Sequence, residues 1–494
     1  MKTLICIPCL LTGGTEIQTL NTVQALVQGG HEVTVACYFE HTPDMVDRYR
    51  KAGAEVILFS PEGVRVGGYK SILFLYKHLR RAVRAVRPDV VHVQYMAPGA
   101  TVILLLWLMG VKNIIATAHT AADIYKDLRL IHFLQRRCLR AFTCITERAE
   151  RSFFGSSQLY TADMVLGRRN HFTIYNSLPV QLGRSCNEDE YENENCLRNV
   201  ALNLTQISQN SRNNISEQDN QRASQRAKCK FTCDFSASAA SEDVNQQNLD
   251  TITQNTHCYA RVGHPDGDSF AVTKTKTKTK TPSGVSTEDS QLTAHSSQSQ
   301  SSSSLSSSSQ KEPSAPFVLG VVSRLEPIKG MDLVVPTFAE VLKAYPETQL
   351  LVVGDGTLRA SMEEQAAQLG CADHIRFVGR QPQEELSQWY SQMDIVLMPS
   401  RSEGFGLTAI EAMAHGCVMV ASDVGGLPEV VRDGICGLLH RTEDVADMAA
   451  KISTLIGDPA LYTQLRTQSL VEVDKYSFDR YAALMNDLYN KLGR

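Results

Sequence analysis

Short apolar runs that end in loops of glycine and charged residues recur through the carboxyl-terminal part of this 494-residue chain. They lie at 317–322, 349–353, 375–378 and 394–399. An apolar run without alternation is typical of a strand buried on both faces of a parallel sheet. Because helix-like segments separate the runs, the pattern predicts an open α/β sheet. Such a sheet binds ligands at the carboxyl ends of its strands.

The loop after the fourth run has the most informative pattern in the chain. Glycines such as Gly406 let a backbone approach a ligand closely, because they lack a Cβ atom. The first N–H groups of the helix that follows, at Leu407 and Thr408, have no partner within the helix and form a seat for a phosphate. Glu403 and Glu411 flank this seat. Carboxylates accept hydrogen bonds from paired hydroxyls, so the arrangement indicates a nucleotide sugar.

The loops after two other runs fit the same ligand. Arg324 and Lys329 follow the first run, where a guanidinium fork and an ammonium can both reach one pyrophosphate. Gly354 and Gly356 follow the second run and form a tight turn that permits close approach. Taken alone, Arg324 and Lys329 could also be a solvated basic pair. The strand-end position of all these loops places them on one edge of the sheet.

Residues 317–475 resemble the donor-binding domain of family 4 retaining glycosyltransferases, which have the GT-B fold of two facing Rossmann-like domains. The matching motifs are Arg324 with Lys329-Gly330, Gly354-Asp355-Gly356, Glu403-Gly404-Phe405-Gly406 with Glu411, and Ser422-Asp423-Val424-Gly425-Gly426-Leu427-Pro428-Glu429. The resemblance implies that Arg324 and Lys329 bind the diphosphate and that Glu411 accepts the ribose hydroxyls. It also implies that the transferred sugar and the distal phosphate are held by Glu403 and by the backbone of Phe405, Gly406, Leu407 and Thr408.

The amino-terminal part then corresponds to the acceptor-side domain. A strand at 1–8 leads into a loop with Gly13 and Gly14, then a helix at 17–28 and a second strand at 31–39. Together they predict a βαβ unit. In the family this loop closes over the donor phosphates. His119 follows a strand predicted at 113–118, where relatives place a histidine that contacts the transferred sugar. By composition alone, a histidine at the end of such a strand is more often a capped loop residue than a catalytic one. Thr120 also departs from the Asp or Gly that many relatives have.

Four segments are predicted in all: an acceptor-side domain at 1–179, an insertion at 180–316, a donor domain at 317–475, and a carboxyl-terminal helix at 476–494 that packs back on the first domain. Asn, Gln, Ser and Thr dominate the insertion. Such a segment buries too little apolar surface to offset the ~1–2 kcal/mol that ordering each residue costs, so we expect disorder at the interdomain hinge. Asp266-Gly267-Asp268 resembles a metal-binding motif but lacks a strand beneath it, so no metal site is expected.

Targeting signals are weak. The apolar run at 4–11 lacks a small-residue cleavage site, and the run at 102–111 is about half of the ~20 residues that a membrane span needs. The thirteen cysteines are scattered, as expected in a reducing compartment. These features predict a cytoplasmic protein, and the placement of basic residues adds an expected contact with the inner face of the membrane.

The expected membrane contact depends on two basic helices. A helix at 69–88 has an apolar stripe (Ile72, Leu75, Leu79, Val83, Val86) and a basic one (Lys70, Lys77, Arg80, Arg84, Arg87, with Arg81 beside it). A second helix adds Lys126, Arg129, Arg136, Arg137 and Arg140. The basic stripe is either the solvated face of a core helix or a surface resting on anionic lipid, at ~1 kcal/mol for each nearby Lys or Arg. Nucleic acid is not expected as a partner.

The function predicted from the sequence is a metal-independent retaining glycosyltransferase without a cofactor. It would move a hexose-type sugar from a UDP- or GDP-sugar to a hydroxyl of a cell-surface glycan or lipid-linked precursor, as in polysaccharide biosynthesis. Charge on the leaving phosphate would be stabilised by Arg324, Lys329 and the helix start. A nucleotide-sugar epimerase of the same fold and a non-catalytic scaffold remain as alternatives.

Overall fold

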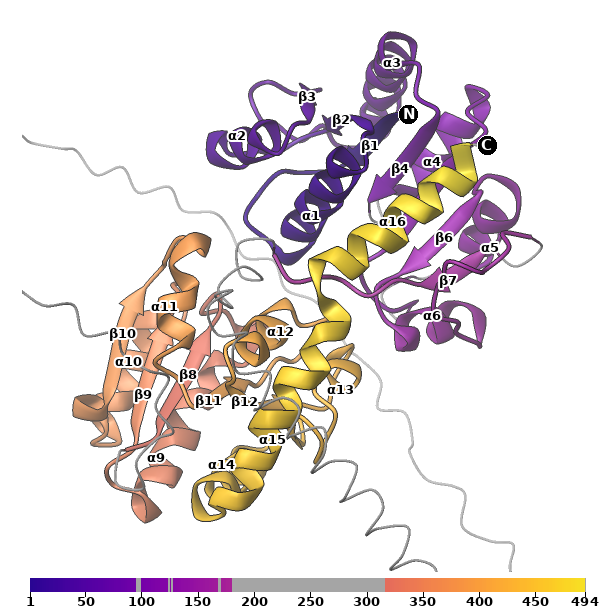
Figure 1. The fold of residues 1–494 in the computed structure, drawn as a ribbon. Helices are drawn as coiled ribbons and strands as arrows, with labels where there is room; N and C mark the ends of the chain where they lie inside the picture. The colour runs from indigo at the N-terminus through magenta and orange to yellow at the C-terminus, as the bar shows by residue number, and fades with distance from the viewer. Residues whose placement is uncertain (95–98, 123–124, 126–127, 168–169, 180–315, 494) are drawn as a thin grey trace, which may run out of the picture. The chain divides into compact units, whose positions relative to one another are not determined.

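The computed structural model describes residues 1–94, 99–122, 125, 128–167, 170–179 and 316–493. Within them the chain forms an amino-terminal lobe (the described part of 1–179) and a carboxyl-terminal lobe (316–477), each built on a parallel sheet (Figure 1). Both lobes belong to one compact unit. None of the described helices is long and apolar enough to cross a bilayer.

The sheet of the amino-terminal lobe has the order β3-β2-β1-β4-β5-β6-β7 in the described residues. Its strands are β1 (Lys2–Ile7), β2 (Glu32–Cys37), β3 (Glu55–Leu58), β4 (Val90–Gln94), β5 (Ile114–Ala118), β6 (Ala141–Cys144) and β7 (His171–Thr173). The helices are α1 (Gly14–Gln28), α2 (Pro43–Lys51), α3 (Tyr69–Val86), α4 (Gly99–Leu108), α5 (Leu128–Arg137) and α6 (Glu147–Phe154). Two apolar cores lie on opposite faces, one with α1 and α2, the other with α3, α4, α5 and α6.

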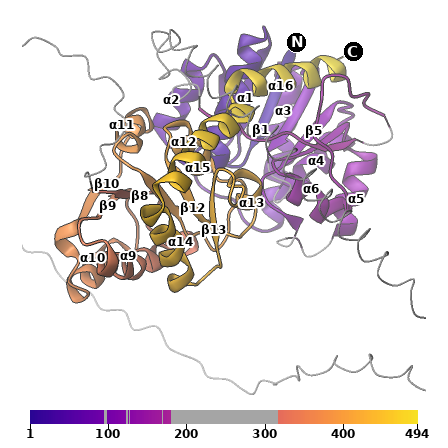
Figure 2. The same cartoon turned by 60° about the horizontal axis from the view of Figure 1, so that its bottom comes forward.

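The carboxyl-terminal lobe has the strand order β10-β9-β8-β11-β12-β13. Its strands are β8 (Val318–Val322), β9 (Gln349–Val353), β10 (Ile375–Gly379), β11 (Ile395–Met398), β12 (Val418–Ser422) and β13 (Gly437–His440). Its α-helices are α9 (Val334–Ala344), α10 (Arg359–Gln368), α11 (Leu386–Tyr390), α12 (Leu407–Ala414), α13 (Leu427–Val430), α14 (Val445–Gly457) and α15 (Pro459–Glu472) (Figure 2). The predicted strands bury apolar side chains on both faces of this sheet.

The last helix, α16 (Phe478–Gly493), packs on the amino-terminal lobe. The Tyr481 hydroxyl lies 2.7 Å from Thr22 Oγ1 of α1, and the Asn486 amide donates to the Ala25 carbonyl at 2.9 Å. Two parallel-sheet lobes with a carboxyl-terminal helix that returns to the first lobe are the arrangement expected of a GT-B fold, and this expectation is confirmed.

The structure differs from expectation in two details. Helix α1 begins at Gly14 rather than at 17, so the second glycine belongs to the helix and the first is its N-cap. Ile72 is 47% exposed and does not join the inward-facing stripe of α3, whereas Leu75 and Leu79 are buried as expected. The insertion expected at 180–316, with Asp266-Gly267-Asp268, lies almost wholly outside the described residues, as does Lys126.

Candidate active site

A cleft of about 890 Å³ lies at the carboxyl ends of strands from both sheets. It is lined by loops that follow β1, β5, β8, β10 and β11. Its wall includes eleven of the predicted site residues: Gly13, Gly14, His119, Arg324, Lys329, Glu403, Phe405, Gly406, Leu407, Thr408 and Glu411. Parallel strands bring their carboxyl ends to one edge, which is why motifs far apart in the sequence meet here.

Lys329 and Glu403 form an ion pair within the cleft. Strands β8 and β11 are neighbours in the sheet, so the loops that follow them lie side by side. The Lys329 ammonium donates to Glu403 Oε2 at 2.6 Å, and their side chains are 22% and 14% exposed. A charge-assisted bond of this length fixes both side chains. The Lys329 ammonium therefore lies in the cleft already oriented by its pairing with Glu403.

The start of α12 faces the amino-terminal lobe. Gly406 is its N-cap and has φ of 102°, a conformation that side chains disfavour. A Cβ atom on Gly14 would lie 3.5 Å from Leu407 Cδ1, so the start of α1 comes within contact distance of the start of α12. Each helix start presents N–H groups and the positive end of a helix dipole. Two such ends in one cleft favour an anionic ligand.

Glu411 lies one turn inside α12 and is 5% exposed. The Tyr390 hydroxyl donates to its Oε2 at 2.9 Å. Burial raises the pKa of Glu411 to about 7, although the hydrogen bond from Tyr390 lowers it. A carboxyl group with this pKa titrates near neutral pH, and a ligand that donates hydrogen bonds to it favours its charged form.

His119 closes the cleft from the amino-terminal lobe and is 6% exposed. Its Nε2 lies 2.8 Å from Gln94 Oε1, an acceptor, so this nitrogen donates. Burial lowers the pKa of His119 to about 3. A neutral imidazole at physiological pH can contact a sugar through hydrogen bonds but brings no positive charge to the site.

Gly354 and Gly356 do not line the cleft, in contrast to the other predicted residues. A Cβ atom on Gly354 would lie 1.8 Å from the Ser323 carbonyl oxygen, and one on Gly356 would lie 2.5 Å from that of Leu325. The close approach that the Gly-Asp-Gly turn permits is therefore to the backbone on either side of Arg324. Their predicted contact with the donor is not tested by this placement.

Sequence reasoning missed two arginines of the cleft wall. Arg380 directly follows β10 and donates to Thr12 Oγ1 at 3.1 Å, across the lobes. Its position after a strand end, like that of Arg324, is a signal that could have found it. Arg48 lies on α2 and donates to Gln383 Oε1 at 2.9 Å. Nothing in the sequence around Arg48 marks it, because it reaches the cleft from a helix rather than from a strand end.

Known proteins resemble this chain in sequence and in structure. The family model for Glycosyltransferase Family 4 matches residues 12–160, and that for Glycosyl transferases group 1 matches 304–470. The D-inositol 3-phosphate glycosyltransferase of Nocardia farcinica is 37% identical over 180 residues, which are 35% of this chain and 40% of that protein. The chain thus spans about 40% of the length of that relative.

Solved structures resemble nearly the whole chain. Anabaena Alr3699/HepE in complex with UDP has a TM-score of 0.61 at 14% identity and covers 99% of this chain and 100% of its own. A glycosyltransferase from Rickettsia africae ESF-5 has a TM-score of 0.61 at 14% identity, covering 99% of this chain and 98% of its own. At this identity the likeness concerns the fold. Because the two family models together match more than half of the sequence, the chain belongs to the family 4 glycosyltransferases of the group 1 type, which have the GT-B fold.

Proposed function

We propose that this protein is a retaining glycosyltransferase that moves a hexose-type sugar from a nucleotide-diphospho-sugar to an acceptor hydroxyl. The observation that carries the proposal is the convergence of Lys329, Glu403, Glu411 and the start of α12 in one cleft. UDP in the Anabaena structure supports a UDP-sugar as donor. The Nocardia farcinica relative, named for an inositol phosphate, supports a hydroxyl-bearing acceptor, which we infer to be a cell-surface glycan or a lipid-linked precursor.

Each part of the donor has a partner of matching chemistry. The diphosphate lies between Arg324, Lys329 and the two helix starts, which supply positive charge to a leaving phosphate. Glu411 accepts the ribose hydroxyls, and Glu403 accepts a hydroxyl of the transferred sugar while it orients Lys329. His119 contacts the same sugar from the other lobe. This set of cationic groups can stabilise the leaving diphosphate without a metal ion.

Transfer proceeds on one face of the sugar. The bond from the anomeric carbon to the phosphate oxygen breaks, and a bond from that carbon to the acceptor oxygen forms on the same side. The proton of the acceptor hydroxyl passes to the departing phosphate. His119, whose pKa burial lowers to about 3, is neutral in the working range and contributes orientation rather than charge.

The outer face of the amino-terminal lobe supports a membrane-side acceptor. The sequences of α3, α4 and α5 contain no Asp or Glu, and α3 exposes Lys70, Lys77, Arg80, Arg81 and Arg84, whereas α5 exposes Arg129, Arg136 and Arg137. Large apolar side chains lie exposed among them, with exposed fractions of 74% for Tyr69, 67% for Leu73 and 65% for Leu108. Cationic and apolar side chains on adjoining helices match the headgroup region of an anionic bilayer. We infer peripheral binding to the inner face of a membrane.

A thermal-shift screen against UDP-, GDP- and ADP-sugars tests the donor assignment. A ligand at about a hundred times its dissociation constant stabilises the folded state by ~2.7 kcal/mol, an easily detected shift. The binding donor is then incubated with and without acceptor, and products are followed by mass spectrometry. A changed nucleotide sugar without acceptor would indicate an epimerase. Absence of binding to all three donors would favour a scaffold.

Vesicle co-sedimentation tests the membrane surface. Vesicles with anionic lipid should bind the protein, neutral vesicles should not, and Leu73→Ser should weaken binding. Leu369→Ser is a matched control, because Leu369 is a 51% exposed leucine of the other lobe. Equal binding to neutral vesicles, or equal loss in both variants, would contradict the inferred surface.

A further inference from the structure

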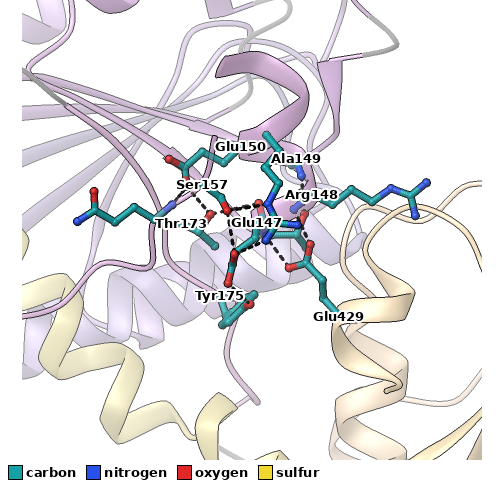
Figure 3. A network of polar contacts seen from close by, with 11 residues as sticks. Glu147, Arg148, Ala149, Glu150, Ser157, Thr173, Tyr175 and Glu429 are labelled. Carbon is teal, nitrogen blue, oxygen red and sulfur yellow. Dashed lines mark hydrogen bonds and ion pairs between the residues drawn. The ribbon is translucent and has the colours of Figure 1, made fainter. Parts of the chain in front are cut away.

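Glu429 lies in the carboxyl-terminal lobe but completes the start of a helix in the other lobe (Figure 3). Its Oε2 accepts a hydrogen bond from the Glu147 N–H at 2.8 Å, and its Oε1 accepts one from the Arg148 N–H. These are the first two residues of α6. The N–H groups at a helix start have no partner inside the helix, and a carboxylate there also meets the positive end of the helix dipole.

The amino-terminal lobe caps the rest of α6 but leaves these two N–H groups to Glu429. The Ala149 N–H donates to Thr146 Oγ1, and the Glu150 N–H donates to the Thr146 carbonyl. The acidic side chains of α6 are engaged elsewhere: Glu147 accepts from Ser157 Oγ at 2.8 Å, and Glu150 accepts from Thr173 Oγ1 at 2.8 Å (Figure 3). The cap of α6 is therefore shared between the lobes.

The shared cap adjoins the places where the chain crosses between lobes. The Leu178 N–H donates to the Tyr476 carbonyl at 2.9 Å, which joins the outgoing and returning segments. The Tyr476 hydroxyl donates to the Glu429 carbonyl at 3.3 Å, and the rings of Tyr175 and Tyr476 pack edge to face with centroids 5.6 Å apart. A contact beside these crossing segments restrains the region about which one lobe would rotate relative to the other. It restrains the far edges of the lobes less.

The shared cap also adjoins the loop that carries Glu403. The Gly426 N–H donates to the Glu403 carbonyl at 3.1 Å, and a Cβ atom on Gly426 would lie 2.8 Å from Thr146 Cγ2, in the N-cap residue of α6. On its other side, Gly404 packs so closely that a Cβ there would lie 2.3 Å from the His119 carbonyl oxygen. The Glu403 loop is thus held between the Gly426 turn and the His119 loop.

We propose that Glu429 is a positioning residue that fixes the spacing between Glu403 and His119 by capping α6 across the lobes. It touches neither donor nor acceptor. Its effect on turnover rests on the proposed transferase function, whereas the cap itself does not. Removal of the carboxylate leaves the Glu147 and Arg148 N–H groups without this acceptor and loosens the contact between the lobes. The spacing between Glu403 and His119 is then no longer fixed at one value.

Two variants and a matched control test the proposal. Glu429→Ala removes both acceptor oxygens, and Glu429→Gln keeps the size and one acceptor, which provides a folded variant if alanine destabilises the protein. Asp423→Asn is the control, because Asp423 lies in the same motif and faces Arg148 at 4.0 Å in an exposed pair across the lobes. Exposed pairs of this kind contribute little to stability.

Amide hydrogen exchange measures the capping of α6 by Glu429 independently of catalytic activity. In Glu429→Ala the amides of Glu147 and Arg148 should exchange at least tenfold faster, while that of Ala149 keeps its wild-type rate. The turnover number should fall at least tenfold, with Glu429→Gln between alanine and wild type. The dissociation constant for the nucleoside diphosphate should change less than threefold, because Arg324, Lys329 and Glu411 all lie in the carboxyl-terminal lobe and their spacing does not depend on α6.

Several outcomes would overturn the proposal. Unchanged exchange at Glu147 and Arg148 would show that Glu429 does not cap α6. Faster exchange with wild-type turnover would show that the cap is a structural contact without effect on catalysis. Equal losses in Asp423→Asn would point to the surface charge of the motif instead. If the wild-type protein neither binds nucleotide nor transfers sugar, the proposed function fails, while the exchange data still decide whether Glu429 caps α6.

Discussion

The two walls of the cleft are built from different kinds of group. The carboxyl-terminal wall contains charged side chains in defined pairs, with Lys329 bound to Glu403 and Glu411 bound to Tyr390. The amino-terminal wall has backbone N–H groups at Gly14 and a neutral histidine, His119, and its charged side chains Asp44 and Arg48 come from α2 rather than from a strand end. Under the proposed function, donor recognition is concentrated in the carboxyl-terminal lobe, whereas the amino-terminal lobe shapes and closes the site. Substitutions on the two walls should therefore differ in size and in kind.

The largest effect is expected at the diphosphate clamp of the carboxyl-terminal wall. Lys329→Ala or Arg324→Ala should lower the transfer rate at least about a hundredfold, because ~3 kcal/mol of charge stabilisation on the leaving phosphate is lost. Circular dichroism should hardly change. Lys343→Ala is the matched control, since its side chain is 69% exposed and pairs with Glu340 away from the cleft. A clamp variant with near wild-type turnover would show that the diphosphate lies elsewhere.

The next effect separates the two glutamates of that wall. Glu411→Ala should weaken donor and free nucleoside diphosphate alike, by roughly 1.5–3 kcal/mol for a charge-assisted hydrogen-bond pair. Glu403→Ala should weaken the intact donor and its turnover without weakening the nucleoside diphosphate, because loss of the ion pair leaves Lys329 available to the phosphates. Calorimetry with both ligands on both variants measures the difference. Equal losses of affinity for the two ligands in Glu403→Ala would show that Glu403 does not contact the transferred sugar.

A smaller effect should appear in the pH dependence of donor binding. The pKa of Glu411 is raised to about 7, so the group is largely protonated below that pH and ionised above it. Because the ionised form accepts the ribose hydroxyls, affinity for an intact nucleotide sugar should rise by up to about tenfold between pH 6 and 8. Glu411→Gln should flatten this rise. His119, with a pKa of about 3, should contribute nothing in this range.

An intact nucleotide sugar is the right ligand for that titration, because its pyrophosphate has no terminal phosphate that titrates near neutral pH. Affinity that falls between pH 6 and 8 in the wild-type protein would reverse the sign and contradict the role of Glu411. A rise that persists unchanged in Glu411→Gln would place the titrating group elsewhere, on either wall of the cleft.

The smallest effect is expected outside both walls. Replacing residues 184–313 by a short Gly/Ser linker should leave folding and turnover close to wild type, because that sequence has too little apolar content to contribute to a core. Thermal unfolding and the transfer assay check this. A variant that fails to fold, or that loses transfer while it keeps nucleotide binding, would show that the segment contributes to the site.

The strand-end motifs of the carboxyl-terminal wall were predictable because each is local. A strand, a loop and a helix start within a few residues of one another define Gly406, Leu407 and Glu411, and the structure places all three on the cleft wall. Arg48 was not predictable, since it reaches the cleft from α2 through a hydrogen bond to Gln383. The packing partner of the Gly-Asp-Gly turn was not predictable either. Glycines allow the backbone to approach a ligand and another backbone segment equally well, and here the partner is the backbone around Arg324.

Sequence alone determined the kind of fold, the strand ends that line the cleft and the types of residue gathered there, because apolar periodicity and helix starts are properties of short segments. Tertiary structure alone decided which of these groups meet. Lys329 and Glu403 are separated by 74 positions, and Glu429 and the Glu147 N–H by 282. Such pairs depend on the order of strands in the sheet and on the contact between lobes. Both arise from burial of apolar surface summed over the whole chain, which no short segment encodes.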